Sequence, residues 1–206
     1  DYARAFAARF PWIQLYTPVN EMFITAVFSA RYGWWNEQRR DDRSYVTAIR
    51  NIVRANLLAM RAILELRPDA IFIQSESTEA FHAECPKALP HAEFRNAERF
   101  LTLDLNYGRR VCSTMYEFLM DSGMTRADYH FFLNEAPALK RHCVMGNDWY
   151  QTNEHLLNAD GHGRWAGEVF GYDTVTRDYH ARYGLPVMHT ETNLDEGPRG
   201  LSLIHI

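Results

Sequence analysis

The sequence has few cysteines, and their spacing suits neither a disulfide framework nor a zinc site. Cys85, Cys112 and Cys143 are odd in number and lie far apart along the chain. Structural zinc sites need closely spaced cysteines and histidines, and the nine histidines show no such spacing either. We therefore predict reduced thiols, a cytoplasmic location and no bound metal.

Long apolar runs and an excess of basic residues are also missing. No stretch of 18 or more apolar residues occurs, which argues against a transmembrane helix. The first ten residues carry charges and lack a long apolar centre, so they do not read as a signal peptide. The formal net charge is −4, whereas proteins that hold nucleic acid through its phosphates need a basic face. Neither a membrane nor a nucleic acid is expected as a partner.

No glycine-rich phosphate loop follows any apolar run, so no nucleotide cofactor is expected. What the chain does have is 206 residues that are 47% apolar, enough for one large domain or two small ones, with a sizeable core. Residues 1–200 are interpreted as a single incomplete domain. The start without Met suggests a fragment of a longer protein, and the apolar ending, residues 201–206, is interpreted as a non-native tail.

Helical patterns alternate with short apolar runs that are typical of buried strands. The clearest helix is predicted over residues 44–67, where apolar residues recur at spacings of three and four and Ser44 is the expected N-cap. Such alternation predicts βα units and a parallel sheet, either part of a barrel or an open α/β sheet. The other predicted helices cover residues 2–10, 96–108, 111–123, 125–134 and 165–183, and the strands 12–19, 70–75, 142–150 and 185–191.

Two glutamates stand at the carboxyl ends of predicted strands. The run "LYTPVNEM" ends in Asn20-Glu21, and "LPVMHTE" ends in Glu191. In parallel α/β folds this edge of the sheet carries the active site, so the two carboxyls can face one another across a pocket. A pair in which one carboxyl stays protonated and the other ionised is what glycoside hydrolysis requires. Either glutamate alone would more often be an ordinary solvated side chain.

The ordered set of motifs resembles glycoside hydrolase family 1. "YTPVNEM" resembles the acid/base segment T-x-N-E-P, "VMGNDWYQTN" the segment G-I-N-Y-Y-T, and "VMHTETN" the nucleophile segment I-T-E-N-G. "AIRNIVRANLLAMRAIL" is similar to the long helix after the acid/base. The two glutamates lie 170 positions apart, which suits that family.

The resemblance implies a retaining β-glycosidase that hydrolyses small β-linked glucosides or galactosides by double displacement. Glu21 would be the general acid/base and Glu191 the nucleophile. Asn20 would hold the 2-hydroxyl of the sugar, and Tyr150 would donate a hydrogen bond to Glu191. Asp148, where the family has Asn, would lie in the same substrate-binding region.

The resemblance also implies a partial (β/α)8 TIM barrel. The chain matches roughly the fourth to seventh strands, and the first three and the eighth are missing. Those strands would supply further sugar contacts, including a tryptophan platform. A half barrel leaves two open sheet edges, so we expect self-association through them. The motif flanks differ from the family at Pro18, Met22, Thr192 and Asn193.

Two other residues are candidates for substrate contact. The segment "IQSESTEAFHAE" is predicted to be a solvated loop. Glu76 is the exception, because it lies closest to the strand end, and it is assigned to the pocket lining. His189 lies two positions before Glu191 and is expected on the same face of its strand, where it would contact the sugar or be a satisfied core histidine.

Two other functions stay open at this point. One is a non-catalytic sugar-binding or interaction module derived from the same barrel, or an inactive fragment of it. The other is a retaining barrel hydrolase of a different clan, with the same two glutamates and another substrate. A carboxyl separation near about 5 Å with Tyr150 on Glu191 would favour the glycosidase. A Glu191 turned away or paired with an arginine would favour the module.

Overall fold

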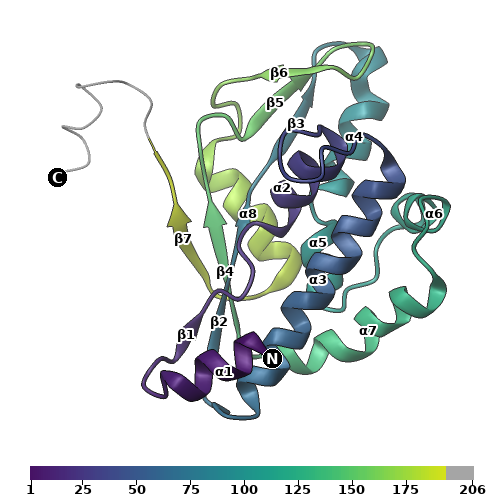
Figure 1. Ribbon diagram of the computed structural model, residues 1–206. Coiled ribbons are helices and arrows are strands. Elements are labelled where there is room, and N and C mark those ends of the chain that lie inside the picture. The colour runs from purple at the N-terminus through teal and green to yellow at the C-terminus, as the bar shows by residue number, and fades with distance from the viewer. Residues whose placement is uncertain (194–206) are drawn as a thin grey trace, which may run out of the picture.

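Four parallel strands form the main sheet of the computed structural model, which describes residues 1–193. Their order is β1-β2-β4-β7, and every neighbouring pair is parallel (Figure 1). The predicted α/β class and the four predicted strands are thus confirmed, although β1 is only two residues long. The predicted tail, residues 201–206, lies outside the described residues. The strands are β1 (Leu15–Tyr16), β2 (Ile71–Ser77), β4 (Cys143–Asp148) and β7 (Val187–Glu191).

Helices connect and cover these strands. The long helix begins at Asp42, because the Asp41 carboxylate accepts a hydrogen bond from the Ser44 N–H at 2.7 Å and caps the helix. The prediction of Ser44 as the cap is therefore wrong by three residues. Thr125 caps α7 as predicted, in a reciprocal capping box with Asp128. The helices are α1 (Tyr2–Arg9), α2 (Met22–Ala26), the π-helix η1 (Val27–Arg31), α3 (Asp42–Leu64), the 3-10 helix η2 (Pro86–Ala88), α4 (Leu89–Glu98), α5 (Leu101–Asn106), α6 (Ser113–Asp121), α7 (Arg126–Lys140) and α8 (Gly171–Tyr183).

The two faces of β2 differ in burial. Phe72, Gln74 and Glu76 are fully buried against the helical layer, and Gln74 accepts a hydrogen bond from Asn56 of α3. Ile71 and Ile73 point to the opposite face and are only half-buried. Side chains of a strand alternate between faces, so the second face is the barrel interior. It is partly open because four strands, where a closed barrel has eight, surround it.

A second sheet extends from the carboxyl ends of the main strands. It consists of β3 (Ala80–Ala83), β5 (Glu154–Leu157) and β6 (Gly163–Trp165), with β3 parallel to β5 and β6 antiparallel to it. No strand was predicted there. The expectation that the segment beginning at Ile73 is a solvated loop is also wrong, because it forms the end of β2 and β3, and Gln74 and Glu79 are buried.

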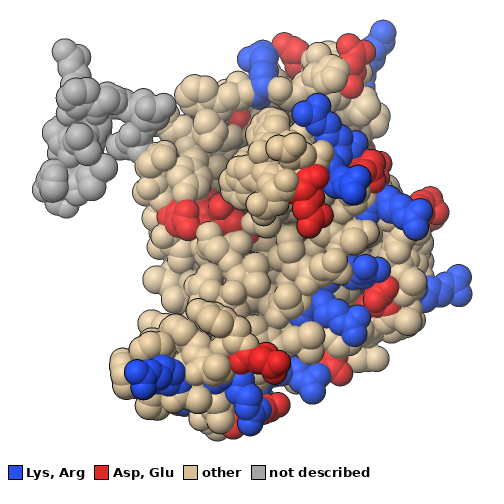
Figure 2. Space-filling view, viewed as in Figure 1, with Lys and Arg blue, Asp and Glu red and all other residues tan. Residues whose placement is uncertain are grey.

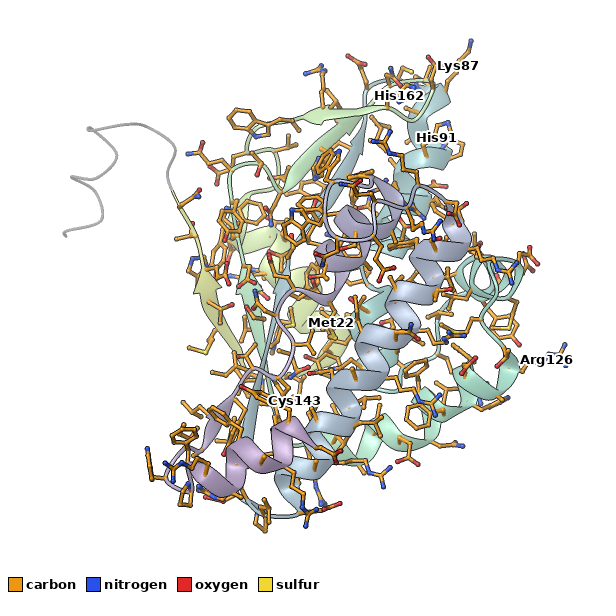
Figure 3. All side chains as sticks on the ribbon, viewed as in Figure 1. Met22, Lys87, His91, Arg126, Cys143 and His162 are labelled. Atoms are coloured by element: carbon orange, nitrogen blue, oxygen red, sulfur yellow. The ribbon has the colours of Figure 1, made fainter. Side chains whose placement is uncertain are left out.

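The direction of the main strands places their carboxyl ends beside the second sheet. Cys143, the first residue of β4, lies low in the view, and Met22, directly after Glu21, lies higher (Figure 3).

Charged side chains gather over the helical side, whereas the side toward β7 is mostly uncharged apart from a small group of acidic side chains (Figure 2). Within residues 1–193, no helix is long and apolar enough to cross a membrane.

Both edges of the main sheet are open in the described part of the chain. An apolar groove of about 600 Å³ runs along β1, between α1 and α3, and Leu15 on this edge is 57% exposed. Met188 on the opposite edge strand is 44% exposed. Apolar side chains in these positions are typical of strands that have neighbours in a complete sheet.

Candidate active site

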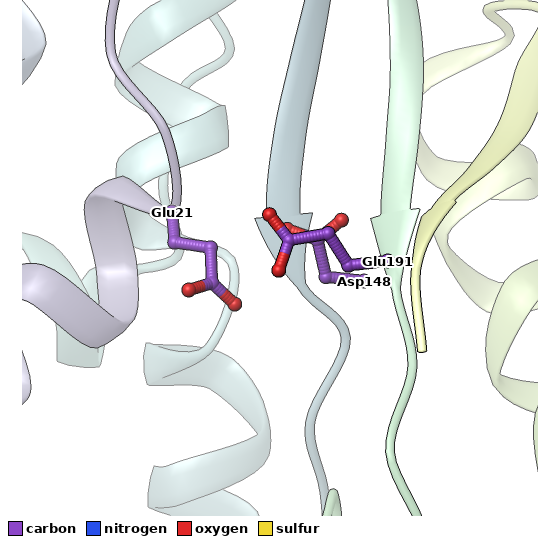
Figure 4. A group of neighbouring side chains, drawn as sticks. All are labelled: Glu21, Asp148 and Glu191. Carbon is purple, nitrogen blue, oxygen red and sulfur yellow. The ribbon is translucent and has the colours of Figure 1, made fainter. Parts of the chain in front are cut away.

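Glu21 is held at the junction of β1 and α2 by its own backbone. Its N–H donates a hydrogen bond to the carbonyl of Ser75 on β2 at 3.0 Å, and its φ is 45°, in the left-handed region. A non-glycine residue there is strained, and such strain persists where the surroundings fix the backbone. The next turn is fixed as well, because the Glu76 carboxylate accepts the Phe23 N–H at 3.0 Å. The Glu21 side chain is thereby aimed at the barrel interior (Figure 4).

Glu191 comes from the end of β7 and is held by two side chains from other elements. The Tyr150 hydroxyl donates to its Oε2 at 2.7 Å, and the Asn20 Nδ2 donates to its Oε1 at 3.2 Å. Within residues 1–193, no basic side chain forms an ion pair with it. The two hydrogen bonds fix the orientation of the carboxylate. The predicted hydrogen bond from Tyr150 to Glu191 is present. Asn20, which was expected to hold the 2-hydroxyl of the sugar, donates a hydrogen bond to Glu191 in this structure.

Asp148 completes a group of three carboxyls. One oxygen each from Glu21, Asp148 and Glu191 lies within 4.8 Å of the others (Figure 4). Asp148 is fully buried at the end of β4, while the two glutamates are half-buried. Its carboxylate accepts hydrogen bonds from Ser75 Oγ at 2.7 Å and from Thr190 Oγ1 at 2.5 Å. Three segments that are far apart in sequence thus contribute to one acidic centre: the N-terminus of α2 and the ends of β4 and β7.

Burial and the neighbouring charges raise the pKa of Glu21 to about 7. Desolvation is the largest cause, followed by the charges of Asp148, Glu191 and Glu79. Burial also raises the pKa of Asp148, against the opposing effect of its hydrogen bonds from Thr190 and Ser75. The pKa of Tyr150 is raised by burial and then by its bond to Glu191, so its hydroxyl stays a donor. Glu21 is therefore set up to carry a proton near neutral pH.

Three carboxylate oxygens this close could also hold a divalent cation. Acidic groups of this kind equally suit proton transfer and nucleophilic attack at a sugar, which need no metal. The predicted absence of a metal therefore stays a prediction.

Two residues assigned to the substrate pocket lie elsewhere. Glu76 is fully buried, faces the helical layer, and accepts hydrogen bonds from the Phe23 N–H and the Thr102 hydroxyl. It supports the start of α2, and the alternation along β2 puts it on the face away from the interior. His189 packs edge-on against Tyr172 of α8, with ring centroids 5.0 Å apart, on the helical side of β7.

His189 lies on the helical side of the sheet because β7 contains a bulge. The register between β4 and β7 shifts so that Asn147 pairs with His189 but Asp148 pairs with Glu191. Thr190 is the extra residue, and its hydroxyl reaches Asp148 inside the barrel. A bulge breaks the alternation of faces, so His189 and Glu191 do not share one.

Ser75 and Thr190 are site residues that the sequence interpretation missed. Both hydroxyls contact Asp148, and they lie 3.2 Å from each other. Gly146 leaves room for them, since a Cβ there would come within 2.9 Å of the Ser75 Cα and of the Thr190 side chain. Ser75 could have been found from the alternation along β2. Thr190 could not, because nothing in the sequence signals the bulge.

Comparison with known proteins gives no match by sequence: no protein family and no curated protein matches the chain. Solved structures of a β-glucosidase from Thermotoga maritima do match by fold. Its complex with azafagomine gives a TM-score of 0.74 at 17% identity, over 97% of this chain and 49% of that one. The structure described as family 1 β-glucosidase from Thermotoga maritima gives 0.74 at 17% identity, over 97% and 48%.

The chain therefore spans about half the length of the structures it matches. The match shows the fold: a mostly parallel α/β sheet that corresponds to about half of a TIM-barrel glycosidase, without a closed barrel. The predicted partial barrel is confirmed. The resemblance to family 1 is supported at the level of the fold.

Proposed function

We propose that this chain carries the catalytic centre of a retaining β-glycosidase. The observation that carries the proposal is the arrangement of Glu21 and Glu191 on facing strand ends, with oxygens within 4.8 Å and Tyr150 bonded to Glu191. Retaining enzymes place their two carboxyls about 5–5.5 Å apart, because the nucleophile must reach the anomeric carbon directly. Inverting enzymes leave a wider gap for a water molecule.

In this proposal the two glutamates differ in protonation and therefore in role. Glu21, with a pKa of about 7, protonates the glycosidic oxygen as the aglycone leaves. Glu191, oriented by hydrogen bonds from Tyr150 and Asn20, attacks the anomeric carbon as a carboxylate and forms a glycosyl-enzyme. Glu21, now ionised, then takes a proton from water as the water oxygen attacks the anomeric carbon; the bond to Glu191 breaks, and the sugar leaves with its original configuration.

The substrate proposed is a small β-linked glucoside or galactoside. One matching β-glucosidase structure holds azafagomine and another holds deoxynojirimycin, which are ligands of that enzyme and support a saccharide site in this fold. The main sheet supplies four strands where a closed barrel has eight, so self-association or strands from elsewhere would complete the pocket. Self-association through the β1 and β7 edges is tested by measuring molar mass in solution, with Leu15→Lys expected to weaken it.

The competing function is a sugar-binding module without catalysis. Product stereochemistry separates the two. Incubation of the chain, and of the full product of its gene, with an aryl β-glucoside and an aryl β-galactoside should give the β-anomer of the free sugar first in proton NMR. The α-anomer first would refute the retaining mechanism. Binding of deoxynojirimycin without any hydrolysis would favour the module.

A further inference from the structure

Asp148 is a third carboxyl in a site whose proposed chemistry uses two. Its side chain is fully buried, and no basic side chain among residues 1–193 pairs with it. Burying a carboxylate without a cation costs stability, and placing it beside two others costs more. The carboxylate therefore has effects on the site that an amide would not have.

The hydrogen bonds of Asp148 tie the ends of three strands together. Both of its oxygens lie 2.7 Å from the Ser75 hydroxyl of β2, and Oδ1 lies 2.5 Å from the Thr190 hydroxyl of β7. Its own carbonyl accepts the Thr78 N–H at 3.2 Å, where the chain leaves β2. Thr190 is the extra residue of the bulge, and Glu191 follows it directly. The position of Glu191 is thus fixed through Thr190 by Asp148.

The electrostatic surroundings of Glu21 consist of acids only. Asp148 faces it from β4, Glu191 from β7 and Glu79 from the turn between β2 and β3. On the nucleophile side lie Tyr150 and His189, and the charge of His189 opposes the rise in the pKa of Asp148. Glu76 accepts the Phe23 N–H at the start of α2. Among these charges, Asp148 has the largest effect on Glu21.

We propose that Asp148 is a positioning residue of this site: through Thr190 it holds the bulge that carries Glu191, and its negative charge keeps the proton on Glu21. The catalytic consequence rests on the proposed function, whereas the effects on geometry and protonation do not. The Asp148 carboxylate itself contacts neither leaving group nor anomeric carbon in this account. It acts through the two glutamates.

The charge effect is tested by Asp148→Asn, which keeps the size of the side chain and one accepting oxygen for the Ser75 and Thr190 hydroxyls. Carbon-13 NMR of carboxyl-labelled glutamates follows the titration of Glu21 directly, without any substrate. We expect the Glu21 midpoint to fall by about one pH unit, since one like charge at this distance is removed. Asp160→Asn, at an exposed turn, is the matched control and should leave the midpoint unchanged. An unchanged midpoint in Asp148→Asn would overturn the proposal.

A measurement on the unmodified protein covers the case in which Asp148→Asn does not fold. With aspartates labelled, Asp148 should lose its proton at a lower pH than Glu21. If Asp148 still held its proton while Glu21 ionised, its charge could not act on Glu21 and the proposal would fail. In the active protein, the high-pH limb of kcat/KM should shift downward with the NMR midpoint. Absence of any glycosidase activity would refute the proposed function but leave the NMR test intact.

The holding effect is tested by Thr190→Val, which keeps Asp148 and its bonds to Ser75. Labelling of Glu191 by a 2-deoxy-2-fluoro glycoside, followed by intact mass, reports how well the nucleophile is aimed. We expect labelling to slow by about tenfold, because a small misplacement of the attacking atom has a large effect on rate. Labelling at the unmodified rate would refute the holding role.

Discussion

The polar side chains on the two faces of the main sheet differ in the partners that surround them. On the helical face, Gln74, Asn56 and Asn106 are joined by three hydrogen bonds, with distances of 2.5 and 2.9 Å from the Asn56 Nδ2, while Asn56 Oδ1 and Gln74 Nε2 have no partner among the described residues. On the interior face, three carboxyls crowd together, and none has a basic partner among residues 1–193. The first arrangement stabilises the fold. The second costs stability, and such costs are typical of functional sites.

The largest effect expected on the interior face is the loss of glycoside hydrolysis in Glu191→Ala. Removing the nucleophile should lower kcat by about 10⁴-fold or more, measured by hydrolysis of an aryl β-glucoside. The melting temperature should change little, because Glu191 is half-buried on an open face. Glu117→Ala, exposed on α6, is the matched control and should retain activity. Activity within a few-fold of the unmodified protein would mean that Glu191 is not the nucleophile.

Opposite faces of β2 should differ in their effect on stability. Phe72→Ala removes a fully buried ring from the helical face and should lower the free energy of unfolding by about 3–5 kcal/mol. Ile73→Ala, one residue later on the interior face, should cost only about 1–2 kcal/mol because Ile73 is half-buried. Urea unfolding measures both. Equal costs would mean that the interior is covered in solution.

The hydrogen-bond set on the helical face should have a smaller effect on stability. Asn56→Ala leaves the buried Asn106 Oδ1 without its donor and Gln74 Oε1 with only the bond from Asn106, and should cost about 1–3 kcal/mol. The control is Asn51→Ala, at an exposed position of the same helix, which should cost less than about 0.5 kcal/mol. A neutral Asn56→Ala would show that these bonds add nothing net.

The smallest effect expected is a pH dependence of stability from Glu21. Its pKa is raised from 4.5 to about 7 on folding, so the folded state binds its proton more tightly than the unfolded state. That contribution is present below pH 4.5 and is lost as the pH rises through about 7. After discounting for solvent screening, Glu21→Gln should stabilise the protein by about 1 kcal/mol more at pH 8 than at pH 4. No such difference in urea unfolding would mean that Glu21 titrates normally.

The sequence predicts the parts of the site that follow from strand ends. Glu21, Tyr150 and Glu191 come together because carboxyl ends of parallel strands share one edge of a sheet. The face of β2 on which Glu76 lies could also have been predicted. Phe72, Gln74 and Glu76 are spaced by two, so they share a face, and Phe72 is plainly a core residue. Proximity to the strand end was the wrong criterion there.

Other features depend on contacts between distant segments and have no local signal. The bulge at Thr190 exists because its hydroxyl reaches Asp148 from another strand, and nothing near residue 190 indicates it. The second sheet contains short strands with Glu154 and His82, residues that favour loops when read alone. Their burial is possible because the Glu154 carboxylate accepts N–H groups at the start of α8 and pairs with His82 at 2.6 Å.

The central claim is that Glu191 is the nucleophile of a double displacement, and covalent trapping tests it most directly. The chain and the full product of its gene would be treated with 2-deoxy-2-fluoro gluco and galacto reagents, then weighed intact and mapped by peptide. We predict one adduct per chain, on Glu191, absent from Glu191→Ala and present in Glu117→Ala. An adduct on another residue, or none on either protein with both sugars, would contradict the account.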